Sequence, residues 1–198
     1  PRSVLEPASR RKTVHSGREK SSSNWSMTDL VTKVCVLGEF AVGKTSTIAR
    51  FVHNEFSEDY LTTVGVKIDT KHVELNQLNL KMVIWDIAGG LTLADGLGSY
   101  VGGSAGLIAV VDGTRPETLD FIEKLLSEVQ GQIGEVPYVV LLNKSDLNSD
   151  WEISEAQLSD LNSRHKNLFI TSAKSGQRVD EALTCLAHEL LAREMEGS

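Results

Sequence analysis

The feature that most constrains the fold is a glycine-rich loop placed directly between a strand pattern and a helix pattern. The run Thr32–Gly38 is apolar and rich in β-branched residues, which predicts a buried strand that ends in glycine. The loop "GEFAVGKT" (Gly38–Thr45) follows, and the segment Gly43–Asn54 has the apolar spacing of a helix. This succession directs backbone N–H groups and a helix N-terminus toward one point, an arrangement that binds phosphate.

Strand and helix patterns alternate along the rest of the chain. The segments Val66–Leu75 and Leu80–Asp86 alternate apolar with polar residues and flank "NQLN" (Asn76–Asn79), which predicts a hairpin. Further strands are predicted at Gly106–Asp112, Pro137–Asn143 and Asn167–Ala173, and helices at Pro116–Gln130, Ser154–Leu161 and Val179–Glu194. We therefore expect an α/β fold with a mostly parallel sheet, one antiparallel edge strand and helices on both faces.

The two ends of the chain differ from its middle. Residues 1–30 are rich in Ser, Arg and Lys without periodicity, which predicts a flexible basic tail. Residues 31–194 are expected to form one domain, and residues 195–198 a short C-terminal tail. Residues 1–28 carry a net charge of +4, which leaves −11 for the rest of a chain whose net charge is −7. A solvated tail is favoured over one that docks on an acidic membrane or partner.

Composition excludes several classes of protein. The net charge of −7 argues against a general nucleic-acid binder. Cys35 and Cys185 lack metal or redox spacing, which fits reduced thiols in a cytoplasmic protein. No apolar run reaches the roughly 18 residues of a membrane helix, and no secretory signal opens the chain. We expect a cytoplasmic protein that is peripheral to membranes only through a partner or the basic tail.

The glycine-rich loop carries the residues of a phosphate site. Lys44 would bridge the β- and γ-phosphates of a nucleotide, and the hydroxyl of Thr45 would bind Mg²⁺. The residues expected around the phosphates are Glu39, Phe40, Ala41, Val42, Gly43, Lys44, Thr45 and Ser46. The alternative is a glycine-rich turn with a surface lysine, which the strand–helix context disfavours.

The next buried strand ends in "WDIAG" (Trp85–Gly89). Asp86 can hold Mg²⁺ through a water molecule, as the carboxylate of a phosphate-loop enzyme does. The N–H of Gly89 can meet the γ-phosphate. The alternative for Asp86 is a helix-capping residue at a strand end, which the preceding phosphate loop disfavours.

Two later motifs indicate the base. In "NKSD" (Asn143–Asp146), the carboxylate of Asp146 can accept hydrogen bonds from a ring N–H and an exocyclic NH₂, a pair that guanine presents and adenine does not. The stem of Lys144 can cover the base. In "SAK" (Ser172–Lys174), the N–H of Ala173 can meet the guanine carbonyl. Each motif is weak alone, but in this order all of them together favour guanine nucleotide binding.

From Thr32 to Leu191 the chain resembles the Ras superfamily of small GTPases, and most closely its Rab-like branch. The resemblance implies a six-stranded sheet with five helices and Mg²⁺-dependent binding of GTP and GDP. It implies that Thr63, in "TTVGV", binds Mg²⁺ and the γ-phosphate in the GTP state, and that Phe56 lies at the edge of the base. The metal ligands are then Thr45 and Thr63, with Asp86 acting through water.

The resemblance also implies partners. Effector, exchange-factor and activating proteins are expected to contact Phe56–Val66 and Asp86–Gly103. The chain itself is expected to be a monomer. The last dozen residues contain no Cys, so the lipid anchor of the family is not expected in this chain.

Departures from the family pattern concern hydrolysis. Gly90 stands where the family has the glutamine that orients the attacking water, and Phe40 stands where the family has a small residue that leaves room for an activating arginine. The catalytic set is then Lys44, Thr63 and Gly89. One hypothesis is a switch with weak intrinsic GTP hydrolysis, and the other is a scaffold that holds GTP without turnover. A kinase that binds ATP is disfavoured by Asp146.

Overall fold

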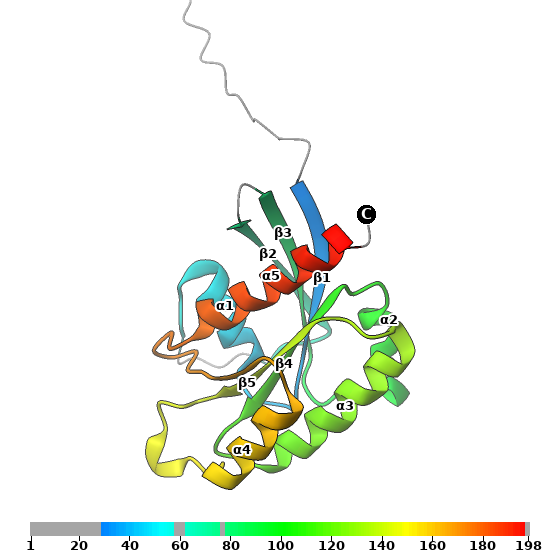
Figure 1. Cartoon of the computed structure of the whole chain (residues 1–198). Helices are drawn as coiled ribbons and strands as arrows, with labels where there is room; N and C mark the ends of the chain where they lie inside the picture. The colour runs from blue at the N-terminus through cyan, green and yellow to red at the C-terminus, as the bar shows by residue number, and fades with distance from the viewer. Residues whose placement is uncertain (1–28, 58–61, 76–77, 197–198) are drawn as a thin grey trace, which may run out of the picture.

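The protein contains one six-stranded sheet with the strand order β2-β3-β1-β4-β5-β6 (Figure 1). The computed structural model describes residues 29–57, 62–75 and 78–196. The strands are β1 (Asp29–Leu37), β2 (Val66–Leu75), β3 (Leu78–Ile87), β4 (Gly106–Asp112), β5 (Tyr138–Asn143) and β6 (Leu168–Ile170). All paired neighbours are parallel except β2 and β3, which are antiparallel. The predicted mostly parallel sheet with one antiparallel edge strand is confirmed.

Five α-helices cover both faces of the sheet in the described ranges. They are α1 (Lys44–His53), α2 (Leu97–Val101), α3 (Glu117–Ile133), α4 (Glu155–Arg164) and α5 (Val179–Glu196). Helices α1 and α5 lie side by side on one face, and α2, α3 and α4 pack on the other (Figure 1). No helix of the described residues combines the length and apolarity needed to cross a bilayer.

The alternation of side chains along β1 shows how the two faces share the core. Val34 and Val36 pack under α1 and α5, whereas Cys35 and Leu37 belong to the cluster under α2, α3 and α4. Successive side chains of a strand point to opposite faces, so both sets are buried only if helices cover both faces. Every residue of β4 is buried for the same reason.

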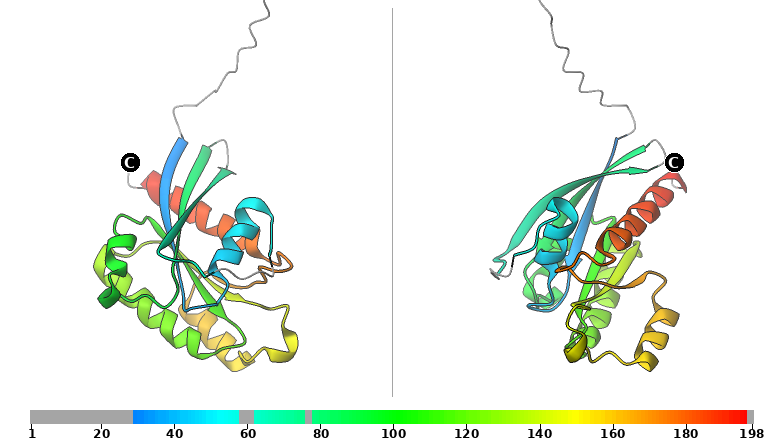
Figure 2. Two further views of the ribbon diagram at one scale, coloured as in Figure 1. Left: turned by 180° about the vertical axis from the view of Figure 1, so that it is seen from behind. Right: turned by 90° about the vertical axis from the view of Figure 1, so that its left-hand side faces the viewer.

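Several element boundaries differ from those expected. Strand β1 begins at Asp29, inside the segment expected to be tail, because Asp29 pairs with Asn79 of β3. Helix α5 continues to Glu196, past the expected domain end at 194. The predicted tail over 1–28 and the last two residues lie outside the described residues. Figure 2 shows the start of β1 and the end of α5 at the same end of the molecule.

Two predicted segments are shorter in the structure. The hairpin turn predicted at Asn76–Asn79 is reduced because Leu78 already pairs with Leu75, so residues 78 and 79 belong to β3. Residues 76 and 77 lie outside the described residues. The last strand ends at Ile170, since the Ala173 N–H instead donates to Asn143 Oδ1 at 3.0 Å. The family resemblance implied a fifth helix, but the position of α2 was not predicted from the sequence pattern, because five residues are too few to show a helical period.

Candidate functional site

The glycine-rich loop joins β1 to α1 and wraps around a buried lysine. Gly43 has φ 98°, and a Cβ there would lie 2.3 Å from Asn143 Nδ2, so the turn requires glycine. The side chain of Lys44 is nearly buried, and its Nζ donates to the carbonyls of Gly38 at 3.2 Å and Glu39 at 3.0 Å. The loop therefore folds its own backbone around the ammonium group.

Burial makes the positive charge of the Lys44 ammonium group unfavourable. Burial lowers the pKa of Lys44 to about 8, against the opposing effects of the Asp86 and Glu39 charges. A cation that is removed from water loses its hydration shell, and a nearby anion compensates for that loss. A phosphate group bound at the N-terminus of α1 would provide that anion.

Three oxygen-bearing side chains meet next to this lysine. Thr45 Oγ1 lies 2.6 Å from Asp86 Oδ2 and 2.8 Å from Thr63 Oγ1. Burial raises the pKa of Asp86, although the Thr45 hydrogen bond and Lys44 oppose the shift. Its second oxygen, Oδ1, is buried and has no hydrogen-bond partner within the described part of the chain. An unsatisfied carboxylate oxygen beside two hydroxyls fits Mg²⁺, which prefers oxygen ligands and binds through one or two carboxylates.

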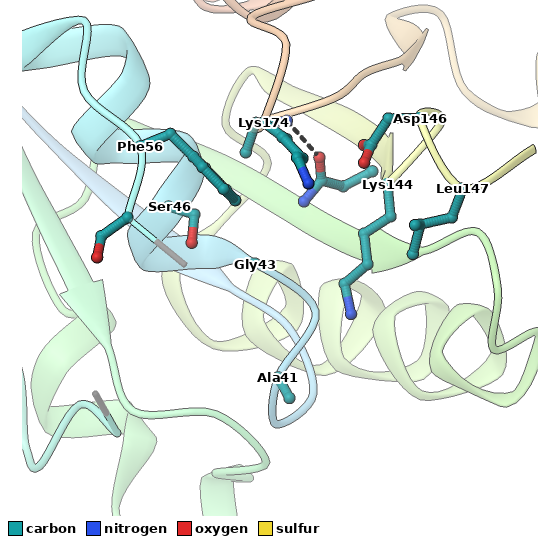
Figure 3. Close-up of a pocket in the computed structure, with 11 residues that line it drawn as sticks. Ala41, Gly43, Ser46, Phe56, Lys144, Asp146, Leu147 and Lys174 are labelled. Atoms are coloured by element: carbon teal, nitrogen blue, oxygen red, sulfur yellow. Dashed lines mark hydrogen bonds between the residues drawn. The ribbon is translucent and has the colours of Figure 1, made fainter. Parts of the chain in front are cut away.

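A cavity of about 250 Å³ opens beside the loop (Figure 3). The ring of Phe56 lies on one side of it, and Lys144 and Asp146 lie across from the ring. Its lining comprises Ala41, Gly43, Ser46, Phe56, Ser57, Asn143, Lys144, Asp146, Leu147, Ala173 and Lys174. Nine of these eleven residues belong to the predicted site, whereas Ser57 and Leu147 were not anticipated.

Two predicted residues hold the cavity walls together. Asn143 Nδ2 donates to the Val42 carbonyl at 3.0 Å, and Asn143 Oδ1 accepts from the Ala173 N–H at 3.0 Å, the bond drawn in Figure 3. The hydroxyl of Ser172 donates to Asp146 Oδ1 at 2.6 Å. Asn143 thus joins three loops, and Ser172 orients the exposed carboxylate that faces the cavity. The side chain of Val42 lies in the core, which leaves only its backbone for a ligand.

A buried carboxylate that sequence reasoning missed connects the cavity to the glycine-rich loop. Asp112, whose side chain is only 1% exposed, ends β4 and accepts from Lys144 Nζ at 2.6 Å and from Arg115 Nε at 3.1 Å. Arg115 Nη2 in turn donates to the Phe40 carbonyl at 2.7 Å. Burial acts to raise the pKa of Asp112, but hydrogen bonds from Lys144 and Thr114 outweigh it and hold the pKa low. Its place at a strand end, like that of Asp86, was the available signal.

Arg50 was also missed, because it lies on the polar side of α1 and belongs to no motif. Its Nε donates to the Ala173 carbonyl at 3.0 Å, and its Nη2 donates to the Lys174 carbonyl at 2.6 Å. Arg50 therefore fastens the loop after β6 to the helix that begins at Lys44.

The glycines after β3 lie against the glycine-rich loop. A Cβ at Gly89 would lie 2.7 Å from both Lys44 Nζ and Phe40 Cα, so a side chain there would collide with the loop. The N–H of Gly90 donates to the Gly38 carbonyl at 3.2 Å. Phe40 is 47% exposed at the tip of the loop. The end of β3 and the loop are thus in direct contact.

Comparisons with known proteins show the family of this chain. Residues 33–192 match the family model described as Ras family. The chain is 34% identical over 168 residues to the Ras-related protein Rab-25 of Bos taurus, covering 83% of this chain and 78% of the relative. It is 30% identical over 167 residues to Rab-13 of Rattus norvegicus, covering 83% and 82%. It is 33% identical over 164 residues to RABA4d of Arabidopsis thaliana, covering 82% and 74%.

Proposed function

This chain belongs to the Ras family of small GTPases and is Rab-like, and from that premise we propose that it is a Mg²⁺-dependent GTP/GDP switch with slow intrinsic hydrolysis. One observation carries the proposal. Asp146 lines a cavity of about 250 Å³ together with Gly43 and Ser46, the residues that flank Lys44 and Thr45, and Thr45 in turn is paired with Asp86. Lys44, the Thr45–Asp86 pair and Asp146 match, in order, phosphate, magnesium and guanine.

Each ligand group has a named partner in this proposal. Lys44 and the N–H groups of the loop bind the phosphates, and Asp146 with the Ala173 N–H recognises guanine. Thr45, Thr63 and Asp86 hold Mg²⁺, the last through water. Bound Mg²⁺ supplies positive charge to the β- and γ-phosphate oxygens. Binding replaces the hydrogen bonds that Lys44 and Thr45 now make within the chain.

The switch operates through the γ-phosphate. Thr63 and the Gly89 N–H are drawn to it in the GTP state and are released after hydrolysis. The neighbouring segments Phe56–Val66, of which residues 58–61 lie outside the described residues, and Asp86–Gly103 are then the contact segments for effector, exchange-factor and activating proteins. Support comes from Val64, an apolar side chain next to Thr63 that is 90% exposed. We further propose that the protein acts as a monomer in the cytoplasm.

Slow turnover follows from the residues at two positions, 90 and 40. Gly90 has no side-chain amide with which to hold a water molecule in line with the γ-phosphorus. Phe40 stands at the loop tip, where an activating protein would insert an arginine worth about 10³–10⁵ in rate. The same two residues favour a second candidate function, a scaffold that holds GTP with essentially no turnover.

The test separates these functions by identifying the bound nucleotide and then measuring one turnover. Protein purified with Mg²⁺ is denatured, and the released nucleotide is chromatographed. GDP, together with slow conversion of freshly loaded GTP, supports the switch. GTP that persists through the single-turnover assay supports the scaffold. Adenine nucleotide, or Lys44→Ala protein that binds GDP as tightly as the unmodified chain, contradicts both.

A further inference from the structure

We propose that the carboxylate of Glu39 positions the attacking water in place of the glutamine side chain that is absent at Gly90. This inference rests on the proposed GTPase function and assigns a catalytic residue to it. It starts from the space next to Gly90, where the family resemblance places the water-orienting group.

Glu39 fills that space. A Cβ at Gly90 would lie 2.8 Å from Glu39 Oε1 and 3.8 Å from Glu39 Cδ. Apart from the immediate chain neighbours of Gly90, no other atom of the described residues comes within 4 Å of that point. The Glu39 carboxylate therefore stands where a side chain at position 90 would begin.

The backbone holds both residues in this arrangement. Glu39 Oε1 accepts from the Phe40 N–H at 2.7 Å, which directs the carboxylate back over the loop. Gly90 has φ +75° and donates its N–H to the Gly38 carbonyl at 3.2 Å. A left-handed backbone and an occupied side-chain site both favour glycine at position 90. The glycine at position 90 and the carboxylate of Glu39 are thus structurally linked, because the carboxylate lies where a side chain at position 90 would begin.

The carboxylate also lies beside the group that binds the reacting phosphate. Lys44 Nζ donates to the Glu39 carbonyl at 3.0 Å and would lie 2.7 Å from a Cβ at Gly89. Glu39, Lys44 and the end of β3 therefore converge on the same side of the loop. A carboxylate has about four acceptor sites, so the bond from Phe40 leaves several of them for a water molecule.

The chemical step balances with water as the second reactant. A Glu39 oxygen accepts a hydrogen bond from the water, whose oxygen forms a bond to the γ-phosphorus. The bond from the γ-phosphorus to the bridging oxygen breaks, the proton of the water passes to the released phosphate, and the products are GDP and inorganic phosphate. A negative acceptor near an anionic γ-phosphate is less favourable than a neutral amide, so this arrangement is expected to give slow turnover.

Single-turnover hydrolysis of preloaded GTP with Mg²⁺ tests the proposal. Glu39→Ala should slow hydrolysis by about tenfold or more, because a misplaced nucleophile is costly. Glu39→Gln keeps an acceptor without the charge and should hydrolyse GTP at least as fast as the unmodified chain. Glu74→Ala on β2 removes the same charge from an exposed position away from the loop, and serves as the control. Glu39→Ala combined with Gly90→Gln should recover part of the lost rate, since the space for a glutamine is then open.

The result that overturns the inference is Glu39→Ala protein that binds GTP and hydrolyses it as fast as, or faster than, the unmodified chain. That outcome leaves the proposed function standing, because nucleotide binding and turnover remain. An unmodified chain that binds no guanine nucleotide, measured by fluorescence with a labelled GDP, would instead overturn the proposed function and this inference with it.

Discussion

The hydroxyl of Thr45 donates a 2.6 Å hydrogen bond to Asp86 Oδ2, and so joins the first turn of α1 to the end of β3. The other oxygen of that carboxylate is buried without a partner in the described residues. One acceptor of the pair is therefore unsatisfied, and we expect both the stability of the chain and its ligand binding to depend on this carboxylate.

We expect Asp86→Asn to stabilise the chain when nucleotide and metal are absent. Burial raises the pKa of Asp86 above its usual 3.8. The stability that the protonated Asp86 contributes is therefore full below pH 3.8 and is lost as the pH rises through the pKa of the folded chain. The ionised carboxylate is thus less favourable than the neutral acid in the folded chain, a cost that the neutral amide of Asn avoids. Thermal unfolding at pH 7 with EDTA should show a higher Tm for the variant than for the unmodified chain.

The same variant should lose the gain in Tm that Mg²⁺ and GDP give the unmodified chain. Glu152→Gln, at an exposed loop position, is the matched control and should change neither measurement. A lower Tm for Asp86→Asn in EDTA would mean that the carboxylate already has a stabilising partner.

GDP affinity should fall as pH rises above about 8. In the nucleotide-free chain, burial lowers the pKa of Lys44 from 10.5 to about 8. The charged lysine therefore disfavours folding below pH 8, and this cost disappears as the pH rises from 8 toward 10.5. A bound phosphate keeps Lys44 charged, so binding takes up a proton above pH 8. Affinity then declines by up to about tenfold per pH unit. Fluorescence titrations with labelled GDP across this range measure the slope.

Lys44→Arg is the control for this pH dependence, because a guanidinium stays charged throughout the range. Its GDP affinity, whatever its absolute value, should be flat between pH 7 and 9.5. The assignment to Lys44 fails if the arginine variant keeps the slope of the unmodified chain.

Asp146→Asn should change the preferred base from guanine to xanthine. Hydrogen bonds to a charged acceptor contribute about 1.5–3 kcal/mol each, so losing one should weaken GDP binding roughly 10- to 100-fold. Xanthine carries an oxygen at C2, which the new NH₂ group can contact. Competition between GDP and XDP measures the preference, and Asp150→Asn in the same loop is the control. Unchanged preference for GDP would remove Asp146 from the base site.

Arg50→Ala should speed GDP dissociation, by about tenfold, while leaving the Mg²⁺ requirement unchanged. The guanidinium holds the carbonyls of Ala173 and Lys174, and without it the loop that presents the Ala173 N–H is free to move. Stopped-flow displacement of labelled GDP gives the rate. Arg193→Ala is a matched control, since Arg193 also donates to a carbonyl, that of Glu135, but at the opposite end of the sheet. Equal rates for the two variants would show that Arg50 has only a structural role.

The sequence alone was enough to predict the sheet, its hairpin and most of the cavity lining. These features depend on short-range patterns: apolar runs such as Gly106–Asp112, the alternation along Val66–Leu75 and the spacing of the glycines before Lys44. A strand followed by a loop and a helix places the motif at the carboxyl end of the strand. Parallel strands then bring the ends of β1, β3, β5 and β6 to one edge.

Only the tertiary structure decided which side chains contact one another at that edge. Glu39 and Gly90, Asp112 and Lys144, and Arg50 and Ala173 are far apart in the chain, and no pattern in the sequence pairs them. Their relationships depend on the direction of single side chains and on φ angles such as +75° at Gly90. Hydrophobic periodicity records which face of an element is buried, but a hydrogen bond within 3 Å depends on how the packed elements are finally placed.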